Sequence, residues 1–364
     1  MFEKEIQFIQ DLYHTKDFIS LHQPYFDDNE KKLVADCITS GFVSSVGKEV
    51  NEFEEKIAKY CGVKKAVACV NGTSALHLAL ILCGIGPNDF VITQDLTFIA
   101  TANAIKYCYA NPIFVDIDKT TLGLSPEKLE DFLKKNQNLN IKAVIAMHSF
   151  GHPCKIDEIK IICEKYNLKV IEDCAESLGS FYQNKHTGNF SDIAIISFNG
   201  NKIITTGGGG MMLFNDEALA KKAKHLSTQA KVNHPWEFIH DEIGYNYRMP
   251  NINASLGLAQ FAKLEKLLEK KRILAQTYHN FFQERFFYEP INSKANYWLN
   301  AIFMDNKDQQ QKFLEITNHH KIMTRPVWRL MHKLPMFIDC PISDLSSANW
   351  VEERLVNIPS WVNL

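Results

Sequence analysis

The sequence has no excess of charge of either sign. Lysine and arginine together number 40, aspartate and glutamate number 42, and the net charge of the 364-residue chain is −2. A nucleic-acid-binding surface usually carries a basic excess, which is missing here. No apolar stretch is long enough to span a bilayer, and the opening residues (MFEKEIQFIQDLYHTKDF) mix charges with apolar side chains, unlike a signal peptide. We therefore expect a cytoplasmic protein that binds neither nucleic acid nor membrane.

The nine cysteines form no C-x-x-C pair, and their number is odd. Several of them, such as Cys69 in AVACVN and Cys83 in LILCG, lie within apolar runs, where a free thiol behaves as a small hydrophobic side chain. Such a pattern is typical of a reducing compartment and not of a disulfide framework. We expect neither a disulfide nor a metal site.

Repeats, low-complexity tracts and linkers are also missing, and the length of the chain suggests two domains. Between residues 60 and 230, short runs rich in Val and Ile are separated by helical patterns. Most of these runs do not alternate with polar residues, so they predict strands that are buried on both faces, as in a parallel sheet flanked by helices. The predicted strands are 64–70, 89–94, 111–118, 141–149, 168–174, 192–198 and 210–215.

Helical patterns fill most of the intervals between these strands. One example is 125–136, where Ser125 is the expected N-cap and Pro126 the first helical residue. A long helical pattern at about 252–286 then leads into short mixed elements. The predicted fold class is α/β, with a large, doubly wound, mainly parallel sheet domain (1–245, including an N-terminal extension). A long helix and a smaller C-terminal α+β domain (246–364) follow.

In open α/β sheets, ligands bind beyond the carboxyl ends of the strands, so polar residues at these ends are the informative ones. The first such group is Asn71–Gly72–Thr73–Ser74, between a predicted strand and a predicted helix. Backbone N–H groups at the start of a helix, together with two hydroxyls, can bind a phosphate. Asn, Thr and Ser are also favoured N-cap residues, so an ordinary helix cap is the alternative interpretation.

The second group is Glu172–Asp173 in KVIEDCAES. Carboxylates at the end of an apolar strand are costly to bury unless they are paired. A carboxylate in this place can keep the ring nitrogen of a cofactor protonated. The same residues could instead bind Mg²⁺ or cap the following helix.

The third group begins where a strand ends at Ser197, continues to Lys202 and ends in four adjacent glycines, Gly207–Gly210. Four glycines carry a large entropic cost, which indicates backbone that passes close to a ligand. A flexible loop with a solvated lysine is the alternative. Together the three groups match pyridoxal phosphate, which needs a phosphate cradle, a carboxylate for its ring nitrogen, and a lysine that bonds to it and moves a proton.

These motifs resemble those of the DegT/StrS-type nucleotide-sugar aminotransferases, which have the aspartate-aminotransferase fold (pyridoxal-phosphate fold type I). The resemblance runs from about residue 18 to residue 360. It is carried by five ordered segments, VNGTSALHLAL, DLTFIATANAI, VIEDCAESLGS, ISFNGNKIITTGGGG and DEIGYNYRMPNINASLG.

The resemblance implies a role for each matching residue. Lys202 would form the Schiff base and transfer the proton, and Asp173 would pair with the pyridinium nitrogen. Phe98 would stack on the ring, in place of the tryptophan of some relatives; on the sequence alone, a core aromatic on a helix is an equal explanation. The remaining cofactor-binding positions are Gly72, Thr73, Ser74 and Ser197 at the phosphate, Glu176 near the phenolic oxygen, and Asn246, which would reach the phosphate of the neighbouring subunit in a homodimer with shared active sites.

Longer strings, such as LSTQAKVNHPWEFIHDEIGYNYRMPNINA, are similar to one branch of the family, which makes 4-amino-4,6-dideoxy-N-acetylglucosamine nucleotides for legionaminic acid or bacillosamine. The implied reaction transfers an amino group from glutamate to the C4 ketone of a nucleotide-linked 4-keto-6-deoxy-N-acetylglucosamine, with UDP as the expected carrier. The chain ends at NIPSWVNL, where relatives usually continue into another helix. Candidate substrate-binding residues, which could equally pack at an interface, are Trp236, Arg248, Arg325 and Trp328.

Other activities are compatible with parts of this pattern. An aminotransferase that acts at C3, or at C4 with the opposite stereochemistry, would share the same motifs. A cofactor-bound dehydratase usually has histidine in place of the lysine, so Lys202 argues against it. A regulator that binds the cofactor without turnover is disfavoured by the absence of a basic DNA-binding segment. A dinucleotide-dependent dehydrogenase is disfavoured because no G-x-G-x-x-G follows the first strand.

Overall fold

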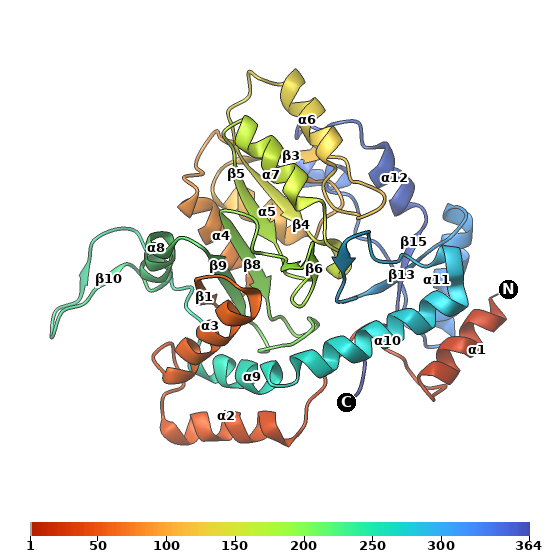
Figure 1. The fold of residues 1–364 in the computed structure, drawn as a ribbon, viewed down its shortest axis with the longest axis horizontal. Coiled ribbons are helices and arrows are strands. Elements are labelled where there is room, and N and C mark those ends of the chain that lie inside the picture. Colours follow the sequence, from red (N-terminus) through yellow and green to blue (C-terminus); the bar gives the residue numbers. More distant parts are fainter. Residues whose placement is uncertain (1) are drawn as a thin grey trace.

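A computed structural model describes residues 2–364, and a seven-stranded sheet lies at its centre (Figure 1). The strand order is β1-β9-β8-β5-β4-β2-β3. Only β9 runs antiparallel to its neighbours within this sheet, which confirms the predicted mainly parallel arrangement. The strands are β1 (Lys65–Cys69), β2 (Phe90–Gln94), β3 (Asn111–Val115), β4 (Ile141–Met147), β5 (Lys169–Asp173), β8 (Ile193–Ser197) and β9 (Gly210–Phe214). Each predicted strand agrees with the observed one to within three residues at either end.

Helices cover both faces of this sheet, because successive strand residues point to opposite sides. In β4, Ala143 and Ile145 pack under one helical layer, and Val144 and Ala146 pack under the other. The first layer contains α4 (Gly72–Leu82), α5 (Ile99–Tyr107) and α8 (Glu217–Ser227). The second layer contains α3 (Lys48–Cys61), α6 (Pro126–Lys135), α7 (Ile156–Lys165) and α9 (Asn251–Phe261). The doubly wound arrangement is therefore confirmed.

The long helix expected at about 252–286 is interrupted. The chain forms α9 and then α10 (Leu264–Phe282), with a turn at residues 262–263 between them. The side chain of Lys263 is buried at this turn, where its Nζ lies 2.6 Å from Glu30 and 2.9 Å from Asp27. Both acidic residues belong to the start of α2 (Asp28–Ser40), so a contact far away in the sequence accompanies the break. The prediction of one continuous helix was wrong.

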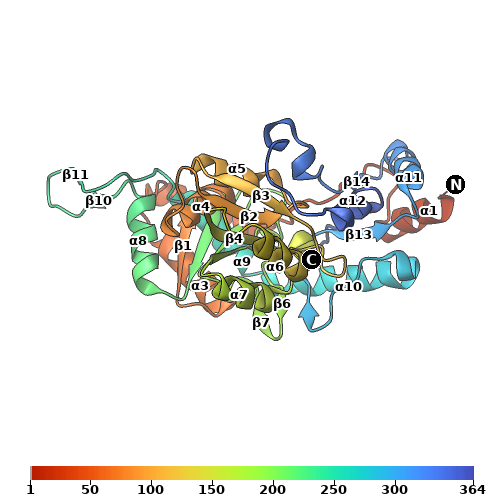
Figure 2. The same ribbon diagram turned by 90° about the horizontal axis from the view of Figure 1, so that it is seen from above.

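A smaller antiparallel sheet, ordered β13-β15-β14, lies in the C-terminal part. It consists of β13 (Asn300–Phe303), β14 (Arg325–Pro326) and β15 (Leu355–Ile358), and it is accompanied by α11 (Lys307–His319) and α12 (Ser346–Glu352). Helix α1 (Glu3–Leu12) lies beside α11 in both views (Figures 1 and 2). Ile6, Ile9 and Ile19 share one apolar cluster with residues of α10 and α11. Our division at residue 245 remains a proposal, and these contacts support moving the N-terminal segment to the smaller unit.

Strands β10 (Lys231–Val232) and β11 (Ile239–His240) form a hairpin that projects from the body of the protein (Figures 1 and 2). Several of its apolar side chains face solvent in the single chain. Trp236 is 77% exposed, and Phe238 and Ile243 are each 83% exposed. An apolar hairpin of this kind indicates a surface that another molecule covers.

Two smaller findings concern the sequence predictions. All nine cysteines are free thiols, as expected. Within residues 2–364, the helices are each too short or too polar to cross a membrane. Within residues 2–364, five short strands lie outside these two sheets: β6 (Phe181–Tyr182), β7 (Lys185–His186), β12 (Ser293–Lys294), and β10 and β11 of the hairpin.

Candidate active site

A cavity of about 290 Å³ lies where the carboxyl ends of β1, β2, β4, β5 and β8 meet. This edge of the sheet is where the topology predicts a ligand site. The cavity brings together eight of the predicted residues: Gly72, Thr73, Phe98, Asp173, Glu176, Ser197, Lys202 and Trp328. It is also lined by Asn71, Leu76, Ala100, Met147, Ala175, Ile195, Asn199, Asn201 and Trp298.

The first turn of α4 faces Ser197 across one end of the cavity. The side chain of Asn71 caps this helix by accepting the N–H of Ser74 at 2.7 Å. The N–H groups of Gly72 and Thr73 have no acceptor within the helix, because they belong to its first turn. A Cβ atom at position 72 would lie 3.0 Å from the Cβ of Ser197, so glycine permits the close approach. Free N–H groups beside a hydroxyl fit a phosphate group.

Asp173 forms the floor of the cavity and is only 2% exposed. Its carboxylate accepts hydrogen bonds from Thr101 Oγ1 at 2.8 Å and from the N–H of Ala175 at 3.1 Å. Burial raises the pKa of Asp173, although these hydrogen bonds act to lower it. Both donors are neutral, so a cationic group in the cavity would stabilise the buried charge. A protonated ring nitrogen is a group of that kind, and Asp173 therefore fits the proposed cofactor.

Glu172 points to the opposite side of β5 and does not line the cavity. Its carboxylate accepts hydrogen bonds from His148 Nε2 at 3.1 Å, from three backbone N–H groups and from the Ser191 hydroxyl. Burial acts to raise the pKa of Glu172, but these donors outweigh burial and hold the pKa below its usual value. Glu172 therefore has a structural role, and of the adjacent pair only Asp173 faces the candidate site.

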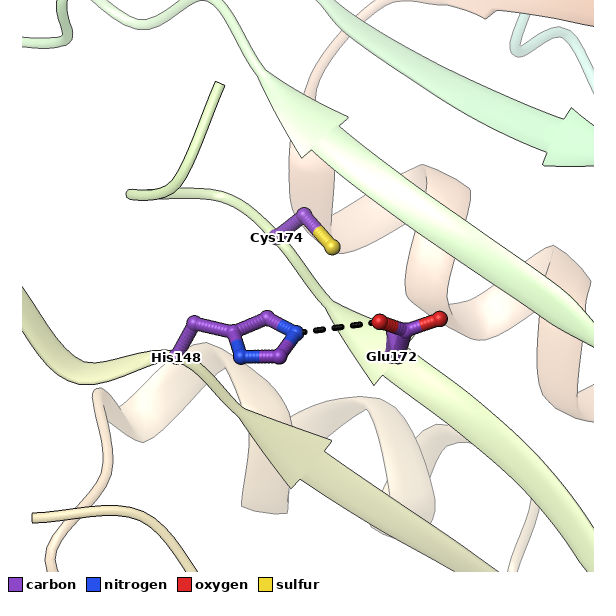
Figure 3. A group of neighbouring side chains, drawn as sticks. All are labelled: His148, Glu172 and Cys174. Carbon is purple, nitrogen blue, oxygen red and sulfur yellow. Dashed lines mark hydrogen bonds and ion pairs between the residues drawn. The ribbon is translucent and has the colours of Figure 1, made fainter. Parts of the chain in front are cut away.

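His148, Glu172 and Cys174 together resemble a set of metal ligands (Figure 3). The backbone N–H of Cys154 donates to His148 Nδ1 at 3.1 Å, so that nitrogen is an acceptor and the proton is on Nε2. The Nε2 proton is then directed at Glu172, as the dashed line in Figure 3 indicates. Because the ligand atoms of His148 and Glu172 are already engaged in hydrogen bonds, we interpret the cluster as part of the packed core.

Lys202 reaches the cavity from the loop after β8. Its Nζ lies 3.3 Å from Glu176 Oε1, and the lysine side chain is 13% exposed. Glu176 Oε2 accepts the backbone N–H of Phe150 at 2.8 Å. Burial raises the pKa of Glu176 to about 7. A lysine beside an acid that titrates near neutrality is suited to covalent and proton-transfer chemistry.

Two of the four glycines after Lys202, Gly209 and Gly210, permit close packing within the protein. None of them lines the cavity. A Cβ at Gly209 would meet Thr206 and Met249, and a Cβ at Gly210 would meet the backbone of Asn71. Gly207 has a φ of +81°, which other residues rarely adopt. A close approach of these glycines to a ligand stays a prediction, and Gly209 and Gly210 closely approach neighbouring chain segments.

Two aromatic rings stand at the mouth of the cavity. Phe98 is the N-cap residue of α5, in extended conformation and 47% exposed, so it precedes the helix. The Phe98 ring contacts Trp328 edge-on, with centroids 6.2 Å apart. Trp328 in turn stacks on Phe150 at 4.8 Å. Phe98 is therefore not a core aromatic within a helix, and its position is compatible with stacking on a planar ligand.

Five predicted residues do not line this cavity in the single chain: Ser74, Trp236, Asn246, Arg248 and Arg325. Asn246 is exposed and forms a β-bridge with Thr228 at the base of the projecting hairpin. Arg248 donates to the carbonyl of Ser45, and Arg325 donates to Asn318 and Thr324. Their proposed roles would require a second subunit or a larger substrate.

Sequence reasoning missed Trp298, Thr101, Asn199 and Asn201. Trp298 precedes β13 in the string ANYWLNAIF, where nothing nearby in the sequence marks it as a cavity residue. Thr101 lies in the first turn of α5, where its bond to Asp173 joins two distant segments. Asn199 and Asn201 lie just before Lys202 in the sequence. This closeness to the lysine was the one sequence signal that they belong to the site.

Comparisons with known proteins agree with this site. The model of the DegT/DnrJ/EryC1/StrS aminotransferase family matches residues 24–364. The GDP-perosamine synthase of Escherichia coli O157:H7 is 38% identical over 356 residues, which cover 95% of this chain and 94% of that protein. The UDP-4-amino-4,6-dideoxy-N-acetyl-beta-L-altrosamine transaminase of Campylobacter jejuni is 36% identical over 274 residues, which cover 74% of this chain and 72% of that protein.

The crystal structure of a DegT DnrJ EryC1 StrS aminotransferase from Brucella abortus is similar at a TM-score of 0.84 and 27% identity, covering 92% of this chain and 90% of that one. The fold and the cavity thus define a pyridoxal-phosphate-dependent aminotransferase of fold type I. The chain belongs to the DegT/DnrJ/EryC1/StrS aminotransferase family. The predicted fold class, family and cofactor are confirmed.

Replacing Glu172 by alanine should destabilise the fold. The change leaves His148 and three backbone N–H groups buried without their acceptor, so we expect the free energy of unfolding to fall by about 3 kcal/mol or more. Urea denaturation measures the effect. Glu158→Ala, at an exposed position of α7, is the control and should change stability by less than about 0.5 kcal/mol. Equal stabilities for the two variants would contradict the structural role of Glu172.

The pKa of Glu176 predicts a pH-dependent stability difference in the cofactor-free protein. Between pH 4.5 and about 7, folded Glu176 keeps a proton that the unfolded chain has lost, so this residue makes the fold less stable as pH rises. Glu176→Gln removes that dependence. We expect the variant to gain stability relative to the original protein by roughly 3 kcal/mol across this window. Denaturation curves at several pH values test this, and parallel curves for the two proteins would refute it.

Proposed function

We propose that the enzyme transfers an amino group from glutamate to the C4 ketone of a UDP-linked 4-keto-6-deoxy-N-acetylglucosamine. The product would be a 4-amino-4,6-dideoxy sugar nucleotide for bacterial surface glycans, made in the cytoplasm. The observation that carries this proposal is the single cavity that joins a phosphate cradle, Asp173 and Lys202 in a chain of this family. The name of the Campylobacter relative specifies a UDP-linked 4-amino-4,6-dideoxy-N-acetyl sugar, which supports the carrier and the position.

Each residue of the cavity would contribute one task to this reaction. The N–H groups of Gly72 and Thr73, with the Ser197 hydroxyl, would hold the cofactor phosphate. Asp173 would keep the ring nitrogen protonated. When bound, pyridoxal phosphate supplies an electron sink for the charge that remains after a carbon gives up its proton. Lys202 Nζ would take that proton and return it to the neighbouring position, and Glu176 would hold the lysine in place.

The substrate is larger than the cavity of a single chain. About 290 Å³ lies at the lower end of the range of roughly 300–1,000 Å³ that is usual for ligand pockets. We propose a homodimer in which the projecting hairpin and its base, from Trp236 to Arg248, complete the site of the partner. The exposed apolar side chains of the hairpin support this arrangement, because solvent-facing groups of this size indicate an interface.

Several other activities are alternatives to this proposal. The Escherichia coli relative is named for a GDP-linked product, so the carrier could differ here. A C3 aminotransferase, or a C4 enzyme of opposite stereochemistry, would use the same cofactor site. A regulator that binds the cofactor without turnover would show no amino transfer from glutamate.

Product analysis tests the proposed reaction. We expect amination when the enzyme, glutamate and cofactor are incubated with the UDP-linked keto sugar, and little with the GDP-linked one. Mass spectrometry detects the amination, and NMR of the product identifies the position and the stereochemistry. Lys202→Ala is the control and should lower the turnover rate by at least about a thousandfold with the fold intact. Amination of the GDP-linked sugar alone would refute the proposed carrier, and amination at C3 would refute the proposed position.

A charged hairpin should separate the proposed dimer. In Trp236→Asp/Ile243→Asp, two exposed apolar side chains become anionic, which would weaken an interface but cost a single chain little stability. Analytical ultracentrifugation should show dimers of the original protein and monomers of the variant, with turnover reduced in parallel. The matched control is Ile161→Asp, since Ile161 is 66% exposed on α7. A monomeric original protein with full activity would refute the shared site.

A further inference from the structure

The Nζ of Lys202 contacts two groups, and only one of them is the acid described above. The second is the indole ring of Trp298, whose centroid lies 3.9 Å from Nζ. Trp298 is 4% exposed and lines the cavity. An ammonium above an indole face is attracted by the negative face of the ring, and the attraction grows when water is excluded.

The ring of Trp298 is fixed relative to the lysine loop. Its Nε1 donates to the carbonyl of Asn201 at 2.6 Å, directly before Lys202 in the chain. Its backbone carbonyl accepts a hydrogen bond from the buried Lys271 of α10 at 3.1 Å. The indole therefore cannot turn away from Lys202 without breaking the hydrogen bond of its Nε1.

One asparagine connects the two groups that contact the lysine. Asn296 Oδ1 accepts the backbone N–H of Trp298 at 2.8 Å, and its Nδ2 donates to the carbonyl of Glu176 at 2.8 Å. Asn296 is fully buried. Asn296 thus holds together the backbone segments that carry the ring and the carboxylate.

The carboxylate alone would hold the ammonium poorly near neutral pH. Burial raises the pKa of Glu176 to about 7, so a substantial part of the population is uncharged there. An uncharged acid attracts an ammonium less strongly than a carboxylate does. The indole face does not titrate, and its attraction for the ammonium persists across this range.

We propose that Trp298 is a positioning residue that holds Lys202 Nζ at the cavity, ready to bond with the aldehyde carbon of pyridoxal phosphate. In that step the ammonium would give up one proton to solvent, and the neutral amine would attack the aldehyde carbon. A C=N bond would replace the C=O bond, and the aldehyde oxygen would leave as water with the two remaining protons of the nitrogen. The inference rests on the proposed role of Lys202 and is independent of the sugar. The competing explanation is that Trp298 is only a wall of the cavity, in which case it would affect every form of the cofactor alike.

Two forms of the cofactor separate these explanations. Pyridoxamine phosphate has an amine in place of the aldehyde and cannot bond covalently to a lysine. Its Kd therefore measures only non-covalent binding in the cavity. The rate at which pyridoxal phosphate bonds to full-length, cofactor-free protein, followed by visible absorbance, also reports the position of Lys202. For Trp298→Leu we expect this rate to fall about tenfold, with the Kd of pyridoxamine phosphate changed less than about twofold. Trp298→Phe retains a ring and should restore most of the rate.

Matched variants complete the design. Trp350 of α12 makes a similar contact, with Lys119 Nζ 4.7 Å from its ring, and it does not line the cavity. Trp350→Leu should leave both measurements unchanged. If Trp298→Leu does not fold, the same measurements are made on Trp298→Met. Methionine also lacks a ring but fills more of the volume of the indole.

The outcomes are distinct. An unchanged rate of bonding in Trp298→Leu would overturn the proposal, and so would an equal loss in the binding of both cofactor forms. Lys202→Ala, measured in parallel, should form no bond at all. If Lys202→Ala still bonds to pyridoxal phosphate, the role of Lys202 fails, whatever Trp298 does. Because no sugar is present, failure of the proposed substrate would leave these results unaffected.

Discussion

The burial of three carboxylates at the end of one strand is the constraint on which the rest of the site depends. Glu172, Asp173 and Glu176 are each at most 2% exposed, and a buried charge without partners is strongly unfavourable. The charge of Glu172 is stabilised by hydrogen bonds to its carboxylate on one side of β5. Asp173 and Glu176 face the cavity, where neutral donors satisfy them only in part. The cavity therefore favours cationic groups, one from Lys202 and one from a protonated cofactor ring.

The site is assembled from both parts of the chain. The large sheet supplies the residues proposed to hold a phosphate, the carboxylates and the lysine, all at the carboxyl ends of its strands. The C-terminal part supplies Trp298 and Trp328, which form the aromatic wall and the mouth of the cavity. The polar groups of the site thus come from rigid strand ends, and its aromatic side chains come from the smaller unit. Motion between the two parts would therefore alter the surroundings of Lys202.

The sequence predicted the parts of this structure that depend on local signals. Runs of Val and Ile marked the strands, and because parallel strands bring their carboxyl ends to one edge, Asp173 and Lys202 could be expected to meet. Contacts between distant segments left no such signal. Trp298 lies 96 residues after Lys202 and was missed. The break between α9 and α10 was also missed, because it accompanies the pairing of Lys263 with Glu30. The glycine run was recognised as unusual, but the close contacts of Gly209 and Gly210 with neighbouring segments could not be predicted from it.

The central claim is that Lys202 is the residue that bonds to pyridoxal phosphate in this cavity. The most direct measurement is peptide mapping of the purified protein after borohydride reduction, which makes the bond between lysine and cofactor permanent. We predict that mass spectrometry will find the cofactor mass on the peptide that contains Lys202 and on no other lysine. A label on a different lysine, or no label in protein whose absorbance shows bound cofactor, would contradict the account.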